Sequence, residues 1–165
     1  MSRGFVKEDD LEHAGTDVPE RQLSQHANYV TVSGYAQLEK LAADLEKQRQ
    51  LLSAKNDDAA AIAQLAVINR DLRYVASRLE HALITKPDAA SEQVLFGATV
   101  TVEDVEGISH TYEIVGEDEA DIKAGKVSWT SPLAKALIGH KMDENVVWAR
   151  PAGNQHLTIT RIIYK

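Results

Sequence analysis

The chain has 165 residues, a formal net charge of −7 and no cysteine. Without thiols, disulfides, thiolate catalysis and zinc–thiolate sites are excluded, and a cytoplasmic location fits. No apolar run approaches the ~18 residues of a membrane span, no secretory signal is visible at the N-terminus, and the net acidity argues against broad nucleic-acid binding. We therefore expect one or two globular domains in the cytoplasm, with no membrane partner.

Residues 1–30 show no sustained periodicity. An acidic stretch at residues 7–12 is followed by Gly15 and Pro19, and this composition predicts a flexible N-terminal extension. The alternative is that Phe5 and Val6 dock on the folded body or on a partner.

Residues 31–84 carry the pattern of an antiparallel coiled-coil hairpin. Leucines recur every seven residues in each arm, at Leu38, Leu45 and Leu52 and again at Leu65, Leu72 and Leu79. In the second arm each leucine is followed three positions later by another apolar residue, at Ile68, Val75 and Ala82. This spacing gives each helix one apolar stripe, and two such stripes bury each other. Thr31 is suited to cap the first helix. Gln48 takes a seam position where Leu would be expected, so it either loosens the pairing or helps to set its register.

The turn between the two arms is polar and carries adjacent acids, Asp57 and Asp58. Acids at this place can cap the second helix, because its first turn has free amides and a positive end. The second arm ends before Pro87, which cannot continue a helix. Residues 85–93 are therefore expected to form a linker.

From Val94 onwards apolar and polar residues alternate. The alternation predicts strands at 96–102, 110–115, 127–129, 145–149 and 156–163. Ser131 can cap a short helix in which Pro132 takes the first position. We therefore predict a small antiparallel sheet with one helix over residues 94–165, and an α+β fold for the whole chain.

Parts of the sequence resemble the bacterial Gre transcription elongation factors. The second half is similar to their C-terminal domain, and the two ends of the helical region are similar to the ends of their coiled coil. The runs that carry the resemblance are Phe96–Val102, Tyr112–Asp121 and Ser131–Gly139 in the second half, and Thr31–Gly34 and Leu79–Ala82 in the first.

The resemblance implies a two-part mechanism. An FKBP-like C-terminal domain grips the rim of the RNA polymerase secondary channel, and the coiled coil enters that channel. Acids at its tip help to hold Mg²⁺ in the polymerase active site, where the ion activates water to cleave a backtracked transcript. The resemblance thus assigns Asp57 and Asp58 an assisting catalytic and metal-binding role. It implies no tightly bound cofactor and no enzyme activity of the chain by itself.

The tip departs from the Gre pattern, in which the two key acids lie three positions apart. Asp57 and Asp58 are adjacent, and adjacent helical positions diverge by about 100°, so both can reach one ion only if at least one lies in the turn. The arms are also shorter by about one heptad, or about 10 Å. A second hypothesis is therefore a cleavage-incompetent competitor or inhibitor of the secondary channel. A third, a prolyl isomerase with a coiled-coil handle, is disfavoured because the second half has few aromatic residues.

The resemblance also suggests two sets of contact residues. Polymerase contacts are expected from an acidic loop and from the start of the short helix, although each also fits as a polar loop or a helix cap: Asp118, Glu119, Asp121, Ser131 and Pro132. Contacts with nascent RNA or the channel wall are expected from four cations on the hairpin, although mixed charges also suit a solvated surface: Arg49, Lys55, Arg70 and Arg73. The six histidines have no metal-binding spacing.

Overall fold

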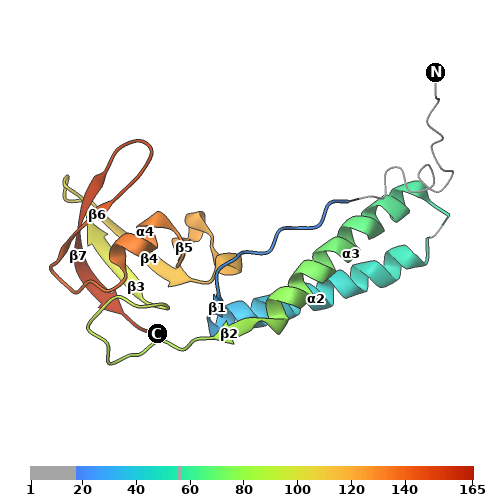
Figure 1. Ribbon diagram of the computed structural model, residues 1–165, viewed down its shortest axis with the longest axis horizontal. Coiled ribbons are helices and arrows are strands. Elements are labelled where there is room, and N and C mark those ends of the chain that lie inside the picture. The colour runs from blue at the N-terminus through green and yellow to red at the C-terminus, as the bar shows by residue number, and fades with distance from the viewer. Residues whose placement is uncertain (1–17, 56) are drawn as a thin grey trace, which may run out of the picture. The chain divides into compact units, whose positions relative to one another are not determined.

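The computed structural model describes residues 18–55 and 57–165, and Figure 1 shows the ribbon. The described chain divides into two compact units. Among the described residues, the first contains 18–25 together with 38–55 and 57–80, and the second contains 26–37 and 81–165. Phe5 and Val6 lie outside the described residues, so their docking stays a prediction.

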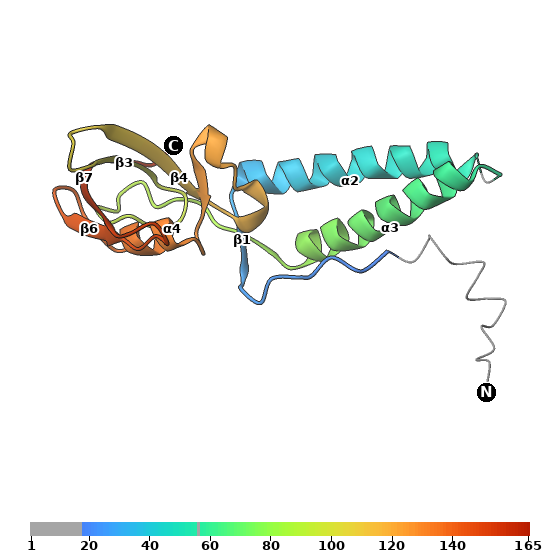
Figure 2. The same cartoon turned by 90° about the horizontal axis from the view of Figure 1, so that it is seen from above.

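Two helices form the predicted hairpin: α2 (Val32–Ser53) and α3 (Ala59–Glu80), each of 22 residues. At 1.5 Å per residue each helix is about 33 Å long, and Figure 2 shows the two side by side. The buried seam consists of Leu38 and Leu45 from α2 and of Ala61, Ile68 and Val75 from α3. The spacing of seven residues between leucines thus predicted the helical hairpin correctly.

The second unit contains a five-stranded sheet with strand order β5-β4-β3-β7-β6. Its strands are β3 (Thr99–Glu103), β4 (Ser109–Val115), β5 (Lys126–Ser128), β6 (Asn145–Trp148) and β7 (Gln155–Ile163). Within residues 94–165 the single α-helix is α4 (Pro132–Leu137). The hydrophobic core of the second unit includes Val100, Ile114, Leu137 and Ile159, all with 0% exposure. The α+β class and the sheet with one helix are confirmed.

One strand departs from the expected antiparallel sheet, because β5 pairs with β4 in parallel. Between these strands the chain passes through two short 3-10 turns, η1 (Glu117–Glu119) and η2 (Ile122–Ala124). These turns return the chain to the beginning of the neighbouring strand rather than reversing it, so the sheet is mixed.

A two-stranded parallel sheet joins β1 (Asn28–Val30) to β2 (Ala82–Ile84). The sequence placed the first segment in a flexible extension and the second in the hairpin, and the structure corrects both boundaries. The pairing buries Val30, and the backbone N–H of Thr85 donates to the carbonyl oxygen of Val30 at 2.9 Å. Each strand has only three residues, which is too short for a periodic signal.

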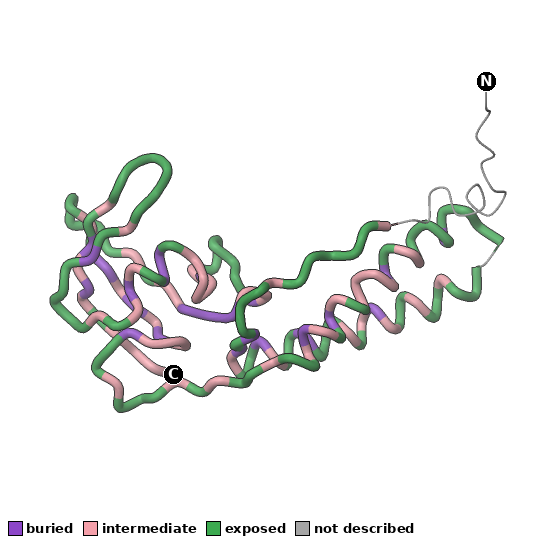
Figure 3. The backbone as a smooth tube through the Cα atoms, viewed as in Figure 1, coloured by how far each residue is buried: buried purple, intermediate pink, exposed green. Residues whose placement is uncertain are grey.

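Residues 18–25, called segment 18–25 below, belong to the first unit and lie beside α3 (Figures 1 and 2). None of its residues is buried, and Figure 3 shows it as a mainly exposed stretch of the tube. Its association with the helix therefore depends on surface contacts. Within the described part of the chain, no helix is both long and apolar enough to cross a membrane.

Candidate functional site

The two acids at the hairpin turn have different environments. The Asp58 carboxylate accepts a hydrogen bond from the backbone N–H of Ala60 at 2.9 Å, and its carbonyl oxygen accepts from the N–H of Ile62 at 3.0 Å. Asp58 therefore caps α3, as the simplest interpretation of the sequence predicts. Asp57 lies exposed in the turn. Among residues 18–55 and 57–165, no group of three or more His, Asp or Glu side chains is arranged to hold a metal ion.

Near this turn, α2 and α3 leave a groove with a volume of about 520 Å³. It is lined by Gln48, Leu51, Leu52, Lys55, Gln64, Val67 and Ile68. Leu51 is 70% exposed. Gln48 lies here in place of a seam leucine, and this position fits the looser pairing expected from its polar side chain.

Two of the four predicted RNA-contacting cations lie on or next to the end of α2. Arg49 donates from Nε to a carboxylate oxygen of Glu46 at 2.9 Å, and this hydrogen bond lowers the pKa of Glu46. Lys55 is exposed beside the turn and lines the groove. The structure thus places Lys55 close to the tip, whereas Arg49 is already paired with an acid on its own helix.

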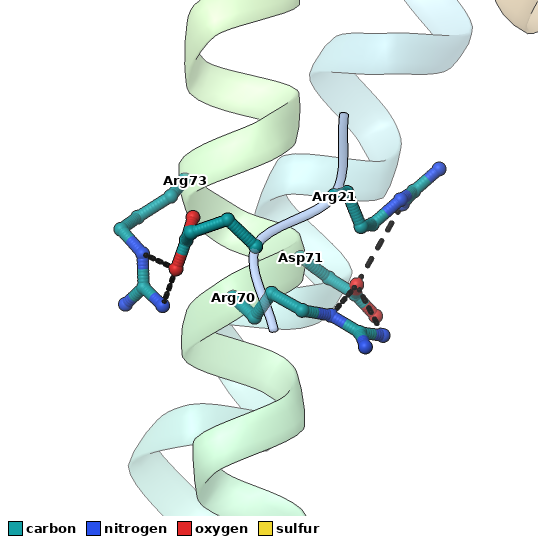
Figure 4. Close-up of polar contacts among 5 residues, drawn as sticks. Arg21, Arg70, Asp71 and Arg73 are labelled. Atoms are coloured by element: carbon teal, nitrogen blue, oxygen red, sulfur yellow. Dashed lines mark hydrogen bonds and ion pairs between the residues drawn. The ribbon is translucent and has the colours of Figure 1, made fainter. Parts of the chain in front are cut away.

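The other two cations, Arg70 and Arg73, lie on α3 under segment 18–25 (Figure 4). Arg70 contacts the Asp71 carboxylate through Nε at 3.1 Å and Nη2 at 3.0 Å. Arg73 donates to one carboxylate oxygen of Glu20, through Nε at 2.9 Å and also through Nη2. The hydrogen bond from Arg73 lowers the pKa of Glu20. Both guanidinium groups therefore have carboxylate partners within the chain.

Glu119 does not lie on the surface as a polymerase contact would. Only 7% of the residue is exposed, and its carboxylate accepts hydrogen bonds from Thr31 N at 3.1 Å, from the Thr31 hydroxyl, and from Gly116 N at 3.0 Å. Gly34 leaves room for this carboxylate, because a Cβ atom there would stand 2.0 Å from Glu119 Cδ. We therefore correct the assignment of Glu119: it fixes the start of α2 within the second unit.

The other acids of this loop remain nearer to the surface. Asp118 lies half-buried in η1. Asp121 is exposed and precedes η2, where its carboxylate accepts from the backbone N–H of Lys123 at 3.1 Å. These two acids stay candidates for a partner contact, although Asp121 also has a local capping role.

The start of α4 forms as predicted from Ser131 and Pro132. The Ser131 hydroxyl oxygen accepts from Ala134 N at 3.2 Å, and Pro132 is the first helical residue. Both line an apolar groove of about 440 Å³, together with Ile122, Val127, Leu133, Trp148, Ala149, Arg150, Pro151 and Ala152.

The sequence analysis missed two features of this groove. The first is Ile122, which is 81% exposed. An apolar residue inside an acidic loop was the sequence signal that could have indicated it. The Arg150 guanidinium carbon lies 5.1 Å from the ring centroid of Trp148, so a cation and an aromatic ring meet at this surface. The contact between Arg150 and Trp148 depends on the conformation of the turn that follows β6, which the sequence pattern does not predict.

Comparisons with known proteins match both parts of the chain. The model of the family "Transcription elongation factor, GreA/GreB, C-term" matches residues 89–164. The chain is 41% identical over 128 residues to transcription elongation factor GreA of Pelobacter propionicus, covering 74% of each protein. It is 54% identical over 81 residues to GreA of Trichlorobacter lovleyi, a match that spans about half of each, 48% of this chain and 49% of that protein.

A solved structure is also similar, that of GreA factor homolog 1 (Gfh1) of Thermus thermophilus. The identity is 25%, the TM-score is 0.40, and the match covers 83% of this chain and 99% of the other.

Proposed function

Since the chain belongs to the GreA/GreB family of transcription elongation factors, we propose that it binds RNA polymerase at the secondary channel and modulates elongation or the cleavage of backtracked transcripts. In this proposal the sheet module holds the channel rim and the hairpin enters the channel. The observation that carries the docking step is the apolar groove beside Ser131 and Pro132, with the exposed Ile122 on its wall. A groove of this kind suits an apolar ridge of a protein partner.

The chemistry would belong to the polymerase, and the chain would contribute a carboxylate. Mg²⁺ is a hard cation that prefers oxygen ligands and activates bound water. Asp57, exposed in the turn, is the acid whose position suits such a shared ion. Asp58 could join it only by giving up its hydrogen bond with Ala60 N. The chain would thus assist hydrolysis without being an enzyme by itself.

A second candidate function is a cleavage-incompetent competitor that occupies the same channel. The specific observation that favours it is the capping role of Asp58, which commits that carboxylate to the start of α3 and leaves a shared ion to Asp57. A single carboxylate holds a shared ion less firmly than two do. The hairpin would then block the channel or displace other factors without supporting cleavage.

Contacts with the nascent transcript are a further part of the proposal. Lys55 lies beside the turn and is exposed, so its ammonium group is well placed for a phosphate near the tip. Arg49 could contribute only in exchange for its hydrogen bond with Glu46.

The test uses backtracked elongation complexes assembled with purified polymerase and end-labelled RNA. Faster appearance of shortened RNA supports the cleavage role, and inhibited elongation without shortened RNA supports the competitor. A protein that neither binds polymerase nor changes its transcription overturns both. Asp57→Asn separates the roles further, since it should abolish a cleavage effect and leave competition intact.

The docking step has a matched pair of variants. Ile122 and Val105 are 81% and 80% exposed, but Ile122 lines the groove and Val105 lies in the turn between β3 and β4. Ile122→Asp should weaken polymerase binding about tenfold or more, as expected for a central contact residue. Val105→Asp should leave the affinity unchanged. Equal affinities of the two variants would contradict docking through the groove.

A further inference from the structure

Segment 18–25 is attached to α3 by charged contacts on one helical face (Figure 4). Glu20 accepts hydrogen bonds from Arg73, with an Nε distance of 2.9 Å. Arg21 lies 3.6 Å from the Asp71 carboxylate, and its guanidinium carbon is 3.7 Å from the ring centroid of Tyr74. The segment therefore contacts Arg73 directly and also contacts Asp71, which is the carboxylate partner of Arg70.

These contacts suit a reversible association. No residue of segment 18–25 is buried, and the side chains of Glu20 and Arg73 remain 62% and 57% exposed. Exposed ion pairs contribute little and are screened by salt. A competing anion of higher charge density can therefore take the place of Glu20 without disrupting the hairpin seam.

The chemistry of the contact between Glu20 and Arg73 indicates which anion can replace Glu20. A guanidinium group offers the same donors to a carboxylate and to a phosphate, so Glu20 occupies Arg73 as a phosphodiester would. The cluster contains three arginines, at positions 21, 70 and 73, against two acids, Glu20 and Asp71. Its formal charge of +1 becomes +2 when the carboxylate of Glu20 is removed.

We propose that segment 18–25 is a releasable strap that closes an RNA-binding face on α3, and that the phosphodiester backbone of single-stranded RNA displaces Glu20 from Arg73. This inference rests on the proposed function in one respect, because that function is the reason for choosing RNA as the competing anion. The strap keeps Arg73 paired while no transcript is near. It opens when a strand brings several phosphates to the same face.

The first experiment measures binding of a fluorescein-labelled single-stranded oligoribonucleotide by anisotropy. Glu20→Gln removes the competing charge, and Glu39→Gln, at an exposed position of α2, changes the net charge equally but leaves the strap in place. For a single strand, each phosphate contact makes the logarithm of the binding constant fall more steeply with the logarithm of the salt concentration, by about 0.7 in slope. One added contact therefore raises the affinity about fivefold at 0.1 M salt relative to 1 M salt. We expect this gain for Glu20→Gln over Glu39→Gln, and its loss when Arg73→Gln is added.

The second experiment locks the strap. Because the chain has no cysteine, Arg21→Cys with Tyr74→Cys provides the only thiols, and a short thiol-cleavable bis-maleimide can bridge them. Glu20, Asp71, Arg70 and Arg73 remain unchanged in this variant. The bridged protein should bind RNA several-fold more weakly than the same protein after the bridge is cut.

The outcomes distinguish a releasable strap from a fixed brace. Equal RNA affinities for Glu20→Gln and Glu39→Gln, or no effect of the bridge, overturn the proposal. A loss of helix stability in Glu20→Gln without a gain in RNA affinity assigns segment 18–25 a purely bracing role and also overturns it. If no variant binds RNA, this inference fails, whereas polymerase binding through the Ile122 groove is measured independently and can still hold.

Discussion

Replacing Gly34 with Ala places a methyl group where the carboxyl group of Glu119 lies. The new Cβ would stand 2.0 Å from Cδ and 2.4 Å from Oε1 of Glu119, so the carboxyl group must retreat by roughly 1.4 Å to restore an ordinary contact. The same carboxylate accepts from Thr31 N at 3.1 Å and Gly116 N at 3.0 Å. A retreat of that size breaks both hydrogen bonds.

Two opposing effects decide the outcome at Gly34. Ala is favoured over Gly inside a helix by about 1 kcal/mol. Each hydrogen bond to a charged group contributes about 1.5–3 kcal/mol, and two are lost at a residue that is only 7% exposed. The loss outweighs the gain, so Gly34→Ala should lower the free energy of unfolding of the second unit by roughly 2–5 kcal/mol.

Urea unfolding followed by tryptophan fluorescence measures this change. Both tryptophans belong to the second unit, and the ring of Trp129 packs against Tyr29 with 5.1 Å between centroids. Combining Gly34→Ala with Glu119→Ala completes a double-mutant cycle: without the carboxylate, Ala at position 34 should be neutral or stabilising. The exposed neighbour Ser33 supplies the control, Ser33→Ala. A Gly34→Ala protein as stable as the wild type would refute the reasoning.

Three further predictions concern stability. Asp58→Ala should destabilise the hairpin by about 1 kcal/mol in thermal melts followed by circular dichroism, whereas Asp58→Asn, which also caps, should cost only a few tenths. Ile114→Ala should lower the free energy of unfolding in urea by about 2–5 kcal/mol, because Ile114 is fully buried, and Val105→Ala should not. The backbone N–H of Ile108, then the His110 side chain, hold the pKa of Asp104 below its ordinary value of 3.8. Asp104 therefore stabilises the fold above about pH 4, and Asp104→Asn should flatten the loss of stability on acidification through that range.

Each stability prediction has an outcome that contradicts it. Equal melting temperatures for Asp58→Ala and Asp58→Asn would show that the cap contributes nothing. Similar urea midpoints for the two Ala variants, at Ile114 and at Val105, would contradict the assigned core. An Asp104→Asn protein that loses stability with acid as steeply as the wild type would show that other carboxylates control that response.

Local periodicity predicted the elements whose signal runs over many residues. The hairpin rests on repeated heptads, and its buried positions Leu38, Leu45, Ile68 and Val75 fall on the expected stripe. The helix cap at Ser131 was also predictable, because a hydroxyl residue before proline has a short-range cause. Such features need no knowledge of distant contacts.

The features that the sequence did not predict depend on distant partners. Glu119 meets Thr31 across 88 positions of the chain, and Glu20 meets Arg73 across 53. The pairing of β1 with β2 joins two segments of three residues each, which are too short to show alternation. Parallel pairing of β5 with β4 likewise depends on the path of the intervening turns.

The acids of this chain show why a residue type alone does not identify a functional site. Asp58 and Asp121 each accept from a backbone N–H two residues ahead, while Glu119 accepts from amides of separate segments. Free amides at helix starts, metal ions and cationic partners all select carboxylates in loops. Asparagine retains the capping oxygen and loses the charge, so Asp→Asn substitution separates the two roles at each position. An acid whose Asn variant keeps stability and loses activity serves a ligand or partner, whereas an acid whose Asn variant keeps both but whose Ala variant loses stability serves as a cap.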